Sequence, residues 1–143
     1  MNRSWAALVK NDATIRTIDI SRLQDYDEFD PDTGESLLDS LLELYLRNSP
    51  ALLDQLRTAV QAGDLPHIHD LAHTLKPSSA SLGASRLSRL YLDLELKSEP
   101  NASTPQSVFE YDLAIVVEEF KNVQRELTLI YNIRNIKPDR IPP

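Results

Sequence analysis

Apolar side chains recur every three or four residues over four stretches of the chain, which is the spacing of one face of an α-helix. The stretches cover about residues 35–62, 65–83, 85–98 and 105–132. Helices joined by short loops pack as antiparallel neighbours. The pattern therefore predicts an all-α protein, an antiparallel four-helix bundle with a short N-terminal helix or segment.

Residues that favour helix ends stand at the borders of these stretches. Gly63 and Gly83 are predicted to end the first two helices, because glycine adopts left-handed backbone angles without strain. Pro50 lies inside the first helix and predicts a kink or a break near residues 48–49. The side chains predicted to cap helix N-termini are Asp19 or Ser21 in an entry segment, Asp32 in a capping box with Glu35, Asp64, Ser85, and Thr104 ahead of Pro105.

The chain divides into a central bundle and two flanking segments. Residues 1–17 show no sustained period and are expected to form a tail or a short helix that covers one end of the bundle, with Trp5 as a packing anchor. Residues 18–132 carry the bundle. Residues 133–143 contain three prolines and are expected to be a disordered or loosely docked tail.

Composition narrows the class of function. The net charge of −7 and the pI near 4.9 argue against nucleic-acid binding, which needs a basic surface. The absence of cysteine excludes disulfides, thiolate metal ligands and cysteine nucleophiles. No apolar run approaches the ~18 residues of a membrane span, and the N-terminal apolar patch is too short for a signal peptide. A soluble cytoplasmic protein that does not enter a membrane is expected.

The second predicted helix carries the candidate chemistry. Its core-facing stripe consists of Ile68, Leu71, Ala72, Leu75, Ser79 and Leu82. The stripe turned away from the core consists of His69, His73, Lys76, Pro77 and Ala80. His73 and Lys76 are neighbours one turn apart. An imidazole beside an ammonium group, with small residues after it, is typical of a nucleophile that meets an anionic group.

The residues around His73 match a known family. Residues 73–84 read His-Thr-Leu-Lys-Pro-Ser-Ser-Ala-Ser-Leu-Gly-Ala. This sequence resembles the signature of histidine-containing phosphotransfer (HPt) domains, His-x-Leu-Lys-Gly-Ser/Ala-Ser/Ala-x-x-hydrophobic-Gly-Ala. The helical pattern of residues 18–132 also fits the family. One position departs from the signature, because Pro77 stands where the family has glycine.

The resemblance implies a phosphocarrier more than an enzyme. His73 would accept a phosphoryl group from the aspartyl phosphate of a response-regulator receiver domain and pass it to a second receiver. The partners would be receiver domains or a hybrid histidine kinase, and the receiver would supply the Mg²⁺, so no cofactor of the chain's own is expected. The chain has no Gly-rich ATP-binding loop, so the phosphoryl group must come from another protein. Met1 and the short flanks favour a free-standing protein over a fragment of a hybrid kinase.

Further residues are expected to support His73. Lys76 would offset the negative charge of the phosphoryl group. By resemblance, Glu95 on the third helix would accept a hydrogen bond from one ring nitrogen of His73 and leave the other free to attack. An equally good interpretation makes Glu95 a solvated surface charge. Ser79 is expected to pack between helices, and Gly83 to end its helix.

Pro77 leaves two outcomes open. A proline there cannot donate to the carbonyl of His73 and clashes with it, which predicts a kink at the active histidine. Water or a serine could take that carbonyl and leave transfer intact, which is the favoured outcome. Otherwise the protein would be a phosphotransfer-impaired adaptor that binds receiver or kinase domains. A partner is expected to dock on an apolar patch around His73, for which Leu23, Leu71 and Ala80 are the candidates.

Two other classes of function are weaker. His69 and His73 are four residues apart with Asp70 beside them, a spacing that can hold zinc, but no third ligand is evident elsewhere. A serine hydrolase would need a Gly-x-Ser-x-Gly turn and a strand to present it, and the sequence has neither. The adaptor alternative also includes a protein whose helical, acidic surface binds a partner without phosphoryl chemistry.

Overall fold

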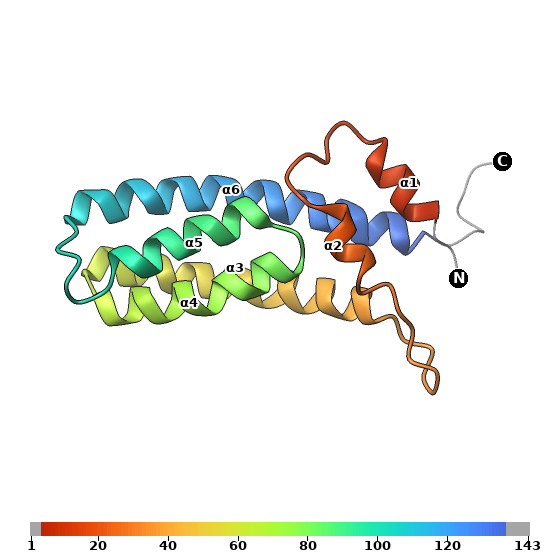
Figure 1. The fold of residues 1–143 in the computed structure, drawn as a ribbon, viewed down its shortest axis with the longest axis horizontal. Helices are drawn as coiled ribbons and strands as arrows, with labels where there is room; N and C mark the ends of the chain where they lie inside the picture. The colour runs from red at the N-terminus through yellow and green to blue at the C-terminus, as the bar shows by residue number, and fades with distance from the viewer. Residues whose placement is uncertain (1–3, 137–143) are drawn as a thin grey trace.

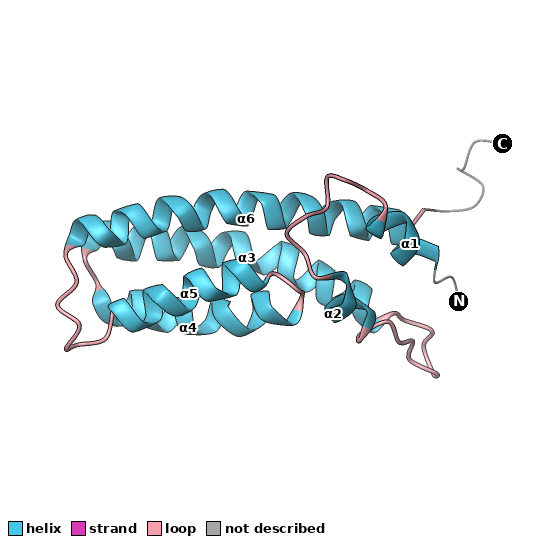
Figure 2. Ribbon diagram, turned by 45° about the horizontal axis from the view of Figure 1, so that its top comes forward, coloured by secondary structure: helices cyan, strands magenta, loops and turns pink. Residues whose placement is uncertain are grey.

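The structure, a computed structural model, describes residues 4–136, and within them it is all helical with no strand (Figures 1 and 2). Four long helices form the bundle, so the predicted all-α fold is confirmed. Each packs against its neighbours in the chain, and α6 packs back against α3. The helices are α1 (Ser4–Lys10), α2 (Ile20–Gln24), α3 (Leu37–Ala62), α4 (Leu65–Ser81), α5 (Ser85–Lys97) and α6 (Gln106–Arg134).

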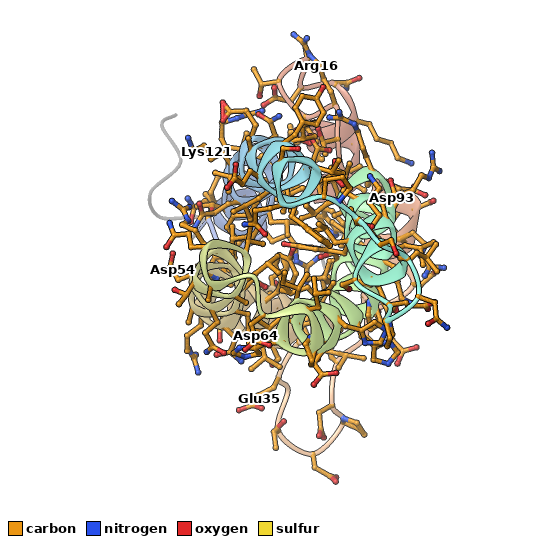
Figure 3. All side chains as sticks on the ribbon, turned by 90° about the vertical axis from the view of Figure 1, so that its left-hand side faces the viewer. Arg16, Glu35, Asp54, Asp64, Asp93 and Lys121 are labelled. Atoms are coloured by element: carbon orange, nitrogen blue, oxygen red, sulfur yellow. The ribbon has the colours of Figure 1, made fainter. Side chains whose placement is uncertain are left out.

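The core runs along the axis of the bundle and takes side chains from all six helices. Figure 3 looks along the bundle, where side chains fill the space between the helices while the labelled Asp54, Asp93 and Lys121 lie on the outside. The stripe predicted for the second helix is buried along its whole length, from Ile68 to Leu82. The helix periodicity therefore identified the core-facing side of α4 correctly.

Local signals at the junction of α3 and α4 behave as predicted. Gly63 has a left-handed φ of 66° and ends α3. Asp64 caps α4 by accepting a hydrogen bond from the backbone N–H of His67 at 3.2 Å. Asp19 caps α2 in the same way through the backbone N–H of Ser21. These polar side chains satisfy N–H groups that have no partner inside the first turn of a helix.

The predicted start of α3 is wrong. The helix begins at Leu37, and its cap is Ser36, which accepts from the backbone N–H of Asp39 at 3.2 Å. Asp32 lies in a tight turn, where its N–H donates to the side chain of Asp30 at 2.8 Å. An aspartate side chain that stabilises a turn competes with one that caps a helix, and the sequence does not distinguish the two uses.

The caps predicted for the last two helices are also wrong. Ser85 is the first residue of α5, and the capping position belongs to Ala84, which makes no side-chain bond. Thr104 donates its hydroxyl to the carbonyl of Lys97 at 2.8 Å, which fixes the loop between α5 and α6. Pro105 takes the capping position itself, and α6 extends to Arg134, two residues beyond the predicted end.

Pro50 does not break α3, which is helical from Leu37 to Ala62. The proline removes one backbone hydrogen bond. Tyr45, Ser49 and Leu53 are buried on both sides of it. Tertiary packing therefore holds the two halves of the helix together, and of the two predicted outcomes the break near residues 48–49 does not occur.

The N-terminal segment is fixed against the end of the bundle. The expected short helix is α1, and Trp5 is 3 % exposed, as a packing anchor should be. Its indole N–H donates to Asp27 at 3.1 Å, and the guanidinium of Arg134 lies 4.8 Å from its ring centre. The buried carboxylate of Glu126 accepts from the backbone N–H groups of Thr17 and Ile18 at 2.8 and 3.1 Å.

The described part of the chain ends within the predicted C-terminal tail. Most of the predicted C-terminal tail, residues 137–143, lies outside the described residues. Across residues 4–136, no helix combines the length and the apolar character that a membrane span requires.

Candidate functional site

His73 stands near the middle of α4 with its side chain 68 % exposed. The buried stripe of α4 fixes the rotation of the helix, and this turns His73 outward. Helix α5 lies beside α4 in both ribbon views (Figures 1 and 2) and contributes the residue beneath the imidazole. The hydroxyl of Ser88 donates to the carbonyl of Lys76 at 2.9 Å, which holds the two helices together at this point.

Glu95 is buried beneath His73 and Lys76 and contacts both. Its carboxylate oxygens each lie 3.1 Å from Nδ1 of His73. The ammonium nitrogen of Lys76 lies 2.8 and 3.1 Å from the same two oxygens. The side chain of Glu95 is only 8 % exposed, so the interpretation as a solvated surface charge is wrong.

Glu95 is held in its ionised form. The hydrogen bond from Lys76 is the largest influence and holds the pKa of the Glu95 carboxyl below its ordinary value. Burial acts in the opposite direction, and the hydrogen bond from His73 lowers the pKa further. A carboxylate can only accept, so Nδ1 of His73 carries a proton, and in the neutral imidazole the lone pair is on Nε2.

Lys76 occupies a different position from the one expected. Its side chain is 30 % exposed and directed toward Glu95, whereas the sequence predicted a solvent-side neighbour of His73. The reason is the buried carboxylate, which attracts the ammonium group more strongly than bulk water in a partly desolvated environment. Lys76 and Glu95 therefore form an ion pair directly below the imidazole.

Ser79 and Gly83 lie below the exposed face of α4. The hydroxyl of Ser79 is fully buried and bonded to the hydroxyl of Tyr45 at 2.9 Å, which links α3 with α4. Gly83 has a φ of +79°, and a Cβ there would lie 2.5 Å from the carbonyl oxygen of Asp19. The backbone N–H of Asp19 donates to the carbonyl of Gly83 at 2.9 Å. The sequence indicated the helix end at Gly83 but gave no signal for its contact with the N-terminal segment.

Pro77 lies within α4, which runs uninterrupted from Leu65 to Ser81. A serine was one candidate for the carbonyl of His73. Ser78 instead donates to the carbonyl of Leu75 at 3.1 Å, and Ser81 donates to the carbonyl of Pro77 itself at 2.9 Å. The proline ring is exposed on the same helix face as His73.

The candidate docking residues are partly wrong. Leu23 and Leu71 are 0 % and 6 % exposed, so neither can contact a partner, and Ala80 is half-buried. The exposed large apolar side chains on the helices beside α4 are Leu37, at the start of α3, Leu44 within α3, and Leu92 and Leu96 on α5. Short segments such as α2 are too brief for periodicity to separate the buried from the exposed side.

An apolar groove runs along the α3 side of His73. Thr74 and Ser78, the neighbours of His73 on α4, form one wall, and Leu41, Leu44 and Leu52 of α3 form the other. Tyr26, just after α2, closes one end of the groove. The groove thus lies between α3 and the helix that carries His73, and the exposed leucines Leu92 and Leu96 lie on α5, the other helix packed against α4.

The metal interpretation has no third ligand among residues 4–136. The rings of His69 and His73 are stacked, with centres 6.4 Å apart and planes 4° from parallel. Nowhere in this part of the chain do three or more histidine, aspartate or glutamate side chains gather closely enough to hold a metal ion. Two stacked imidazoles alone are a weak zinc site.

Comparison with known proteins gives one family and one solved structure. The Hpt domain family matches residues 40–127. The chain has no significant match among curated proteins. It is similar to the crystal structure of histidine-containing phosphotransfer protein B from Pseudomonas aeruginosa PAO1, with 26 % sequence identity, a TM-score of 0.51, and coverage of 76 % of this chain and 95 % of that one. Because the family match spans more than half of the chain and includes His73, the protein belongs to the Hpt domain family of two-component phosphocarriers.

Proposed function

We propose that the protein is a phosphorelay intermediate that accepts a phosphoryl group on His73 from a receiver-domain aspartate and passes it to another receiver domain. The observation that carries this proposal is the contact of Nδ1 of His73 with the buried carboxylate of Glu95, at 3.1 Å to each oxygen. This contact leaves Nε2 free on a side chain that is 68 % exposed. An oriented, neutral and accessible imidazole is what a nucleophile for phosphoryl transfer requires.

The proposed transfer needs no proton to leave the imidazole. The lone pair on Nε2 attacks the phosphorus atom of the aspartyl phosphate and forms the N–P bond. The bond between phosphorus and the aspartate oxygen breaks, and that oxygen leaves with the electron pair as a carboxylate. The ring keeps its proton on Nδ1 and gains positive charge, which the ionised Glu95 stabilises. Attack by an aspartate of the second receiver reverses these changes.

Lys76 acts on this step through two effects. Its ion pair with Glu95, at 2.8 Å, keeps the carboxylate ionised and correctly oriented beneath the ring. Its positive charge also lies one helical turn from His73, where it reduces the repulsion between the incoming phosphoryl group and Glu95. In this proposal the receiver supplies the Mg²⁺ and most of the catalysis, and the chain presents the nucleophile.

The partner's contact face follows from the surface around His73. Leu44 on α3, with the groove beside it, and Leu92 and Leu96 on α5 flank the imidazole on two sides. A receiver domain that places its aspartate over Nε2 covers these side chains. Burial of apolar surface around the reacting atoms supplies the affinity, and the polar centre supplies the chemistry.

The adaptor remains the second candidate, and the observation that favours it is Pro77. Its ring occupies the helix face beside Lys76, at the position where the family signature has glycine. A ring at this position reduces the space for a partner's active site. In the adaptor, receiver binding would survive the loss of phosphoryl transfer.

Transfer of label from a ³²P-phosphorylated receiver domain tests the proposal. We expect acid-labile, base-stable label on the wild-type protein, none on the His73→Gln variant, and undiminished label on the His67→Gln variant, which removes another exposed histidine of the same helix. Label on His73→Gln would contradict the assignment of His73. Receiver binding without label on the wild type, with label restored in Pro77→Gly, would establish the adaptor instead.

A further inference from the structure

A second imidazole accompanies His73 on α4. His69 lies one turn earlier, and its ring is stacked on that of His73 with centres 6.4 Å apart and planes 4° from parallel. The third histidine, His67, is turned toward Asp64 at the start of the helix, with its Nδ1 3.9 Å from the carboxylate. The pairing of His69 with His73 is therefore specific to one face of the helix.

The surroundings of His69 restrict its ring. Its side chain is 35 % exposed, about half as much as that of His73. It lines a shallow pocket together with Leu65, Pro66, Ser98 and Pro100. The ring is therefore partly buried beside this pocket, and its plane lies parallel to that of His73.

The charges at the site explain what His69 can contribute. Glu95 pairs with Lys76 at 2.8 Å, so the lysine charge is largely neutralised by the carboxylate beneath His73. A phosphoryl group brings a charge between about −1.5 and −2 to the same surface at neutral pH. The next group along the exposed face of α4 that can become positive is His69, because imidazole gains a proton within the physiological pH range.

We propose that His69 is a second imidazole of the phosphorylation site, whose protonated form stabilises the phosphoryl group on Nε2 of His73. This inference rests on the proposed function and adds a residue to it. His69 forms no covalent bond. Its protonated ring, with a centre 6.4 Å from that of His73, reduces the electrostatic cost of the phosphoryl charge.

The other ionisable groups around the pair set the direction of the effect. Asp70, on the same helix, is 3.7 Å from Nδ1 of His69 and 82 % exposed, so water and salt screen its charge. Helix α5 contributes Glu95, which contacts His73 and Lys76. Stabilisation by His69 must therefore grow as the pH falls toward the range where imidazole is protonated, and vanish at alkaline pH.

The phosphoryl-transfer equilibrium with one receiver domain tests the proposal. It is measured from pH 6 to pH 9 for the wild type, His69→Gln, His69→Lys and His67→Gln. The amount of phosphoryl that each variant holds at equilibrium is divided by the amount that the wild type holds at the same pH. This ratio removes the pH dependence of the receiver and of the phosphohistidine itself. At pH 6 to 6.5 we expect His69→Gln to hold about threefold less phosphoryl than the wild type at equilibrium, since a unit charge at ~6 Å in water changes an equilibrium by about that factor.

The expected profile separates a charge effect from a structural one. At pH 9 the His69→Gln ratio should return to one, His69→Lys should hold phosphoryl at least as well as the wild type throughout, and His67→Gln should match the wild type. If the His69→Gln ratio is one at every pH, or is below one but independent of pH, the inference about His69 is overturned while the proposed function stands. Absence of label on the wild type would overturn the proposed function and this inference with it.

Discussion

Glu95 is the residue on which the proposed chemistry of His73 depends. The histidine is an exposed imidazole on a helix, and exposure alone does not make an imidazole reactive. The carboxylate beneath it fixes which nitrogen carries the proton, and the ion pair with Lys76 keeps that carboxylate charged. Orientation and charge at the nucleophile therefore come from a residue on the neighbouring helix.

Removal of Glu95 should slow transfer while leaving binding intact. In Glu95→Ala the imidazole loses its orientation and the stabilisation of its developing charge, so we expect label uptake from a phosphorylated receiver to fall about tenfold or more. Single-turnover kinetics and receiver affinity measure the two effects separately. Asp93→Asn, which changes an exposed carboxylate on the outer face of α5, is the control (Figure 3). An unchanged rate for Glu95→Ala would contradict the proposed role.

Glu95 should also make the free energy of unfolding depend on pH in the acidic range. Its pKa is lower in the folded protein than its ordinary value of about 4.3, so the folded state binds fewer protons than the unfolded state in that range. The stabilising contribution is complete above the unfolded pKa and is lost as the pH falls through the folded pKa. Denaturant unfolding from pH 7 to pH 3 should therefore show the difference between wild type and Glu95→Gln shrinking below about pH 4.3. A constant difference would show that the carboxylate is not paired in solution.

At the scale of the residue, predicting the site from the sequence requires knowing which side chains are buried. The signature residues made His73 and Lys76 candidates for the site, but periodicity left Glu95 with two equal interpretations. The deciding fact is that α5 packs against α4 at this point, and that packing involves residues far apart in the chain. The same lack of information on burial explains why the docking candidates were partly wrong, since Leu23 is fully buried while Leu92 is exposed.

At the scale of the element, α4 is held at both ends. Asp64 caps its start, and beyond its last turn Gly83 packs against the backbone of Asp19, just before α2. The helix also carries Pro77 within it, so it has lost one backbone hydrogen bond close to His73. The contact at Gly83 therefore contributes to keeping the end of the helix in place.

Gly83→Ala should destabilise the protein by about 2 kcal/mol or more, because it adds a steric clash to a left-handed backbone conformation. The matched control is Gly34→Ala. Gly34 has a similar φ of +73°, but no atom lies within 4 Å of a Cβ placed there, so only the backbone term of about 1 kcal/mol applies. Denaturant titration of both variants measures the difference. Equal losses would contradict the close approach of Asp19 to Gly83.

The ends of the helices show which sequence signals act over only a few residues. The junction of α3 and α4 was predictable because a glycine and a capping aspartate act within a few residues of each other. The starts of α3, α5 and α6 were not, because Ser36, Ala84 and Pro105 take the capping positions instead of the polar residues that were expected there. Pro50 misled for another reason, since the buried neighbours Tyr45 and Leu53 hold α3 together across it.

At the scale of the molecule, the long helices support His73, the proposed phosphoryl acceptor, on the surface of α4. The N-terminal segment covers the end of the bundle and connects to it through Glu126 and Gly83. The apolar side chains left exposed near His73 lie on the two helices that flank α4. The face presented to a partner thus has an ionic centre and apolar sides.

Substitutions on these sides should weaken receiver binding without unfolding the protein. Leu44→Ser and Leu92→Ser should each reduce affinity about fivefold, because covering the exposed part of a leucine side chain at an interface contributes about 1 kcal/mol. Titration calorimetry with the receiver that donates the phosphoryl group measures the affinity. Leu8→Ser, an exposed leucine on α1, should bind like the wild type. Equal weakening by Leu8→Ser would show that binding does not use the face around His73.

The central claim concerns one atom, Nε2 of His73. It is tested most directly by long-range ¹H–¹⁵N NMR of the protein labelled at its histidine rings, recorded before and after phosphorylation by a receiver domain. We expect phosphorus coupling and a large shift at Nε2 of His73, a retained proton on Nδ1, and no N–P coupling at His67 or His69. Phosphorus coupling at Nδ1 of His73, or at another histidine, would contradict the role of Glu95 in selecting the nucleophilic nitrogen. Unchanged histidine signals would show that the protein does not carry the phosphoryl group.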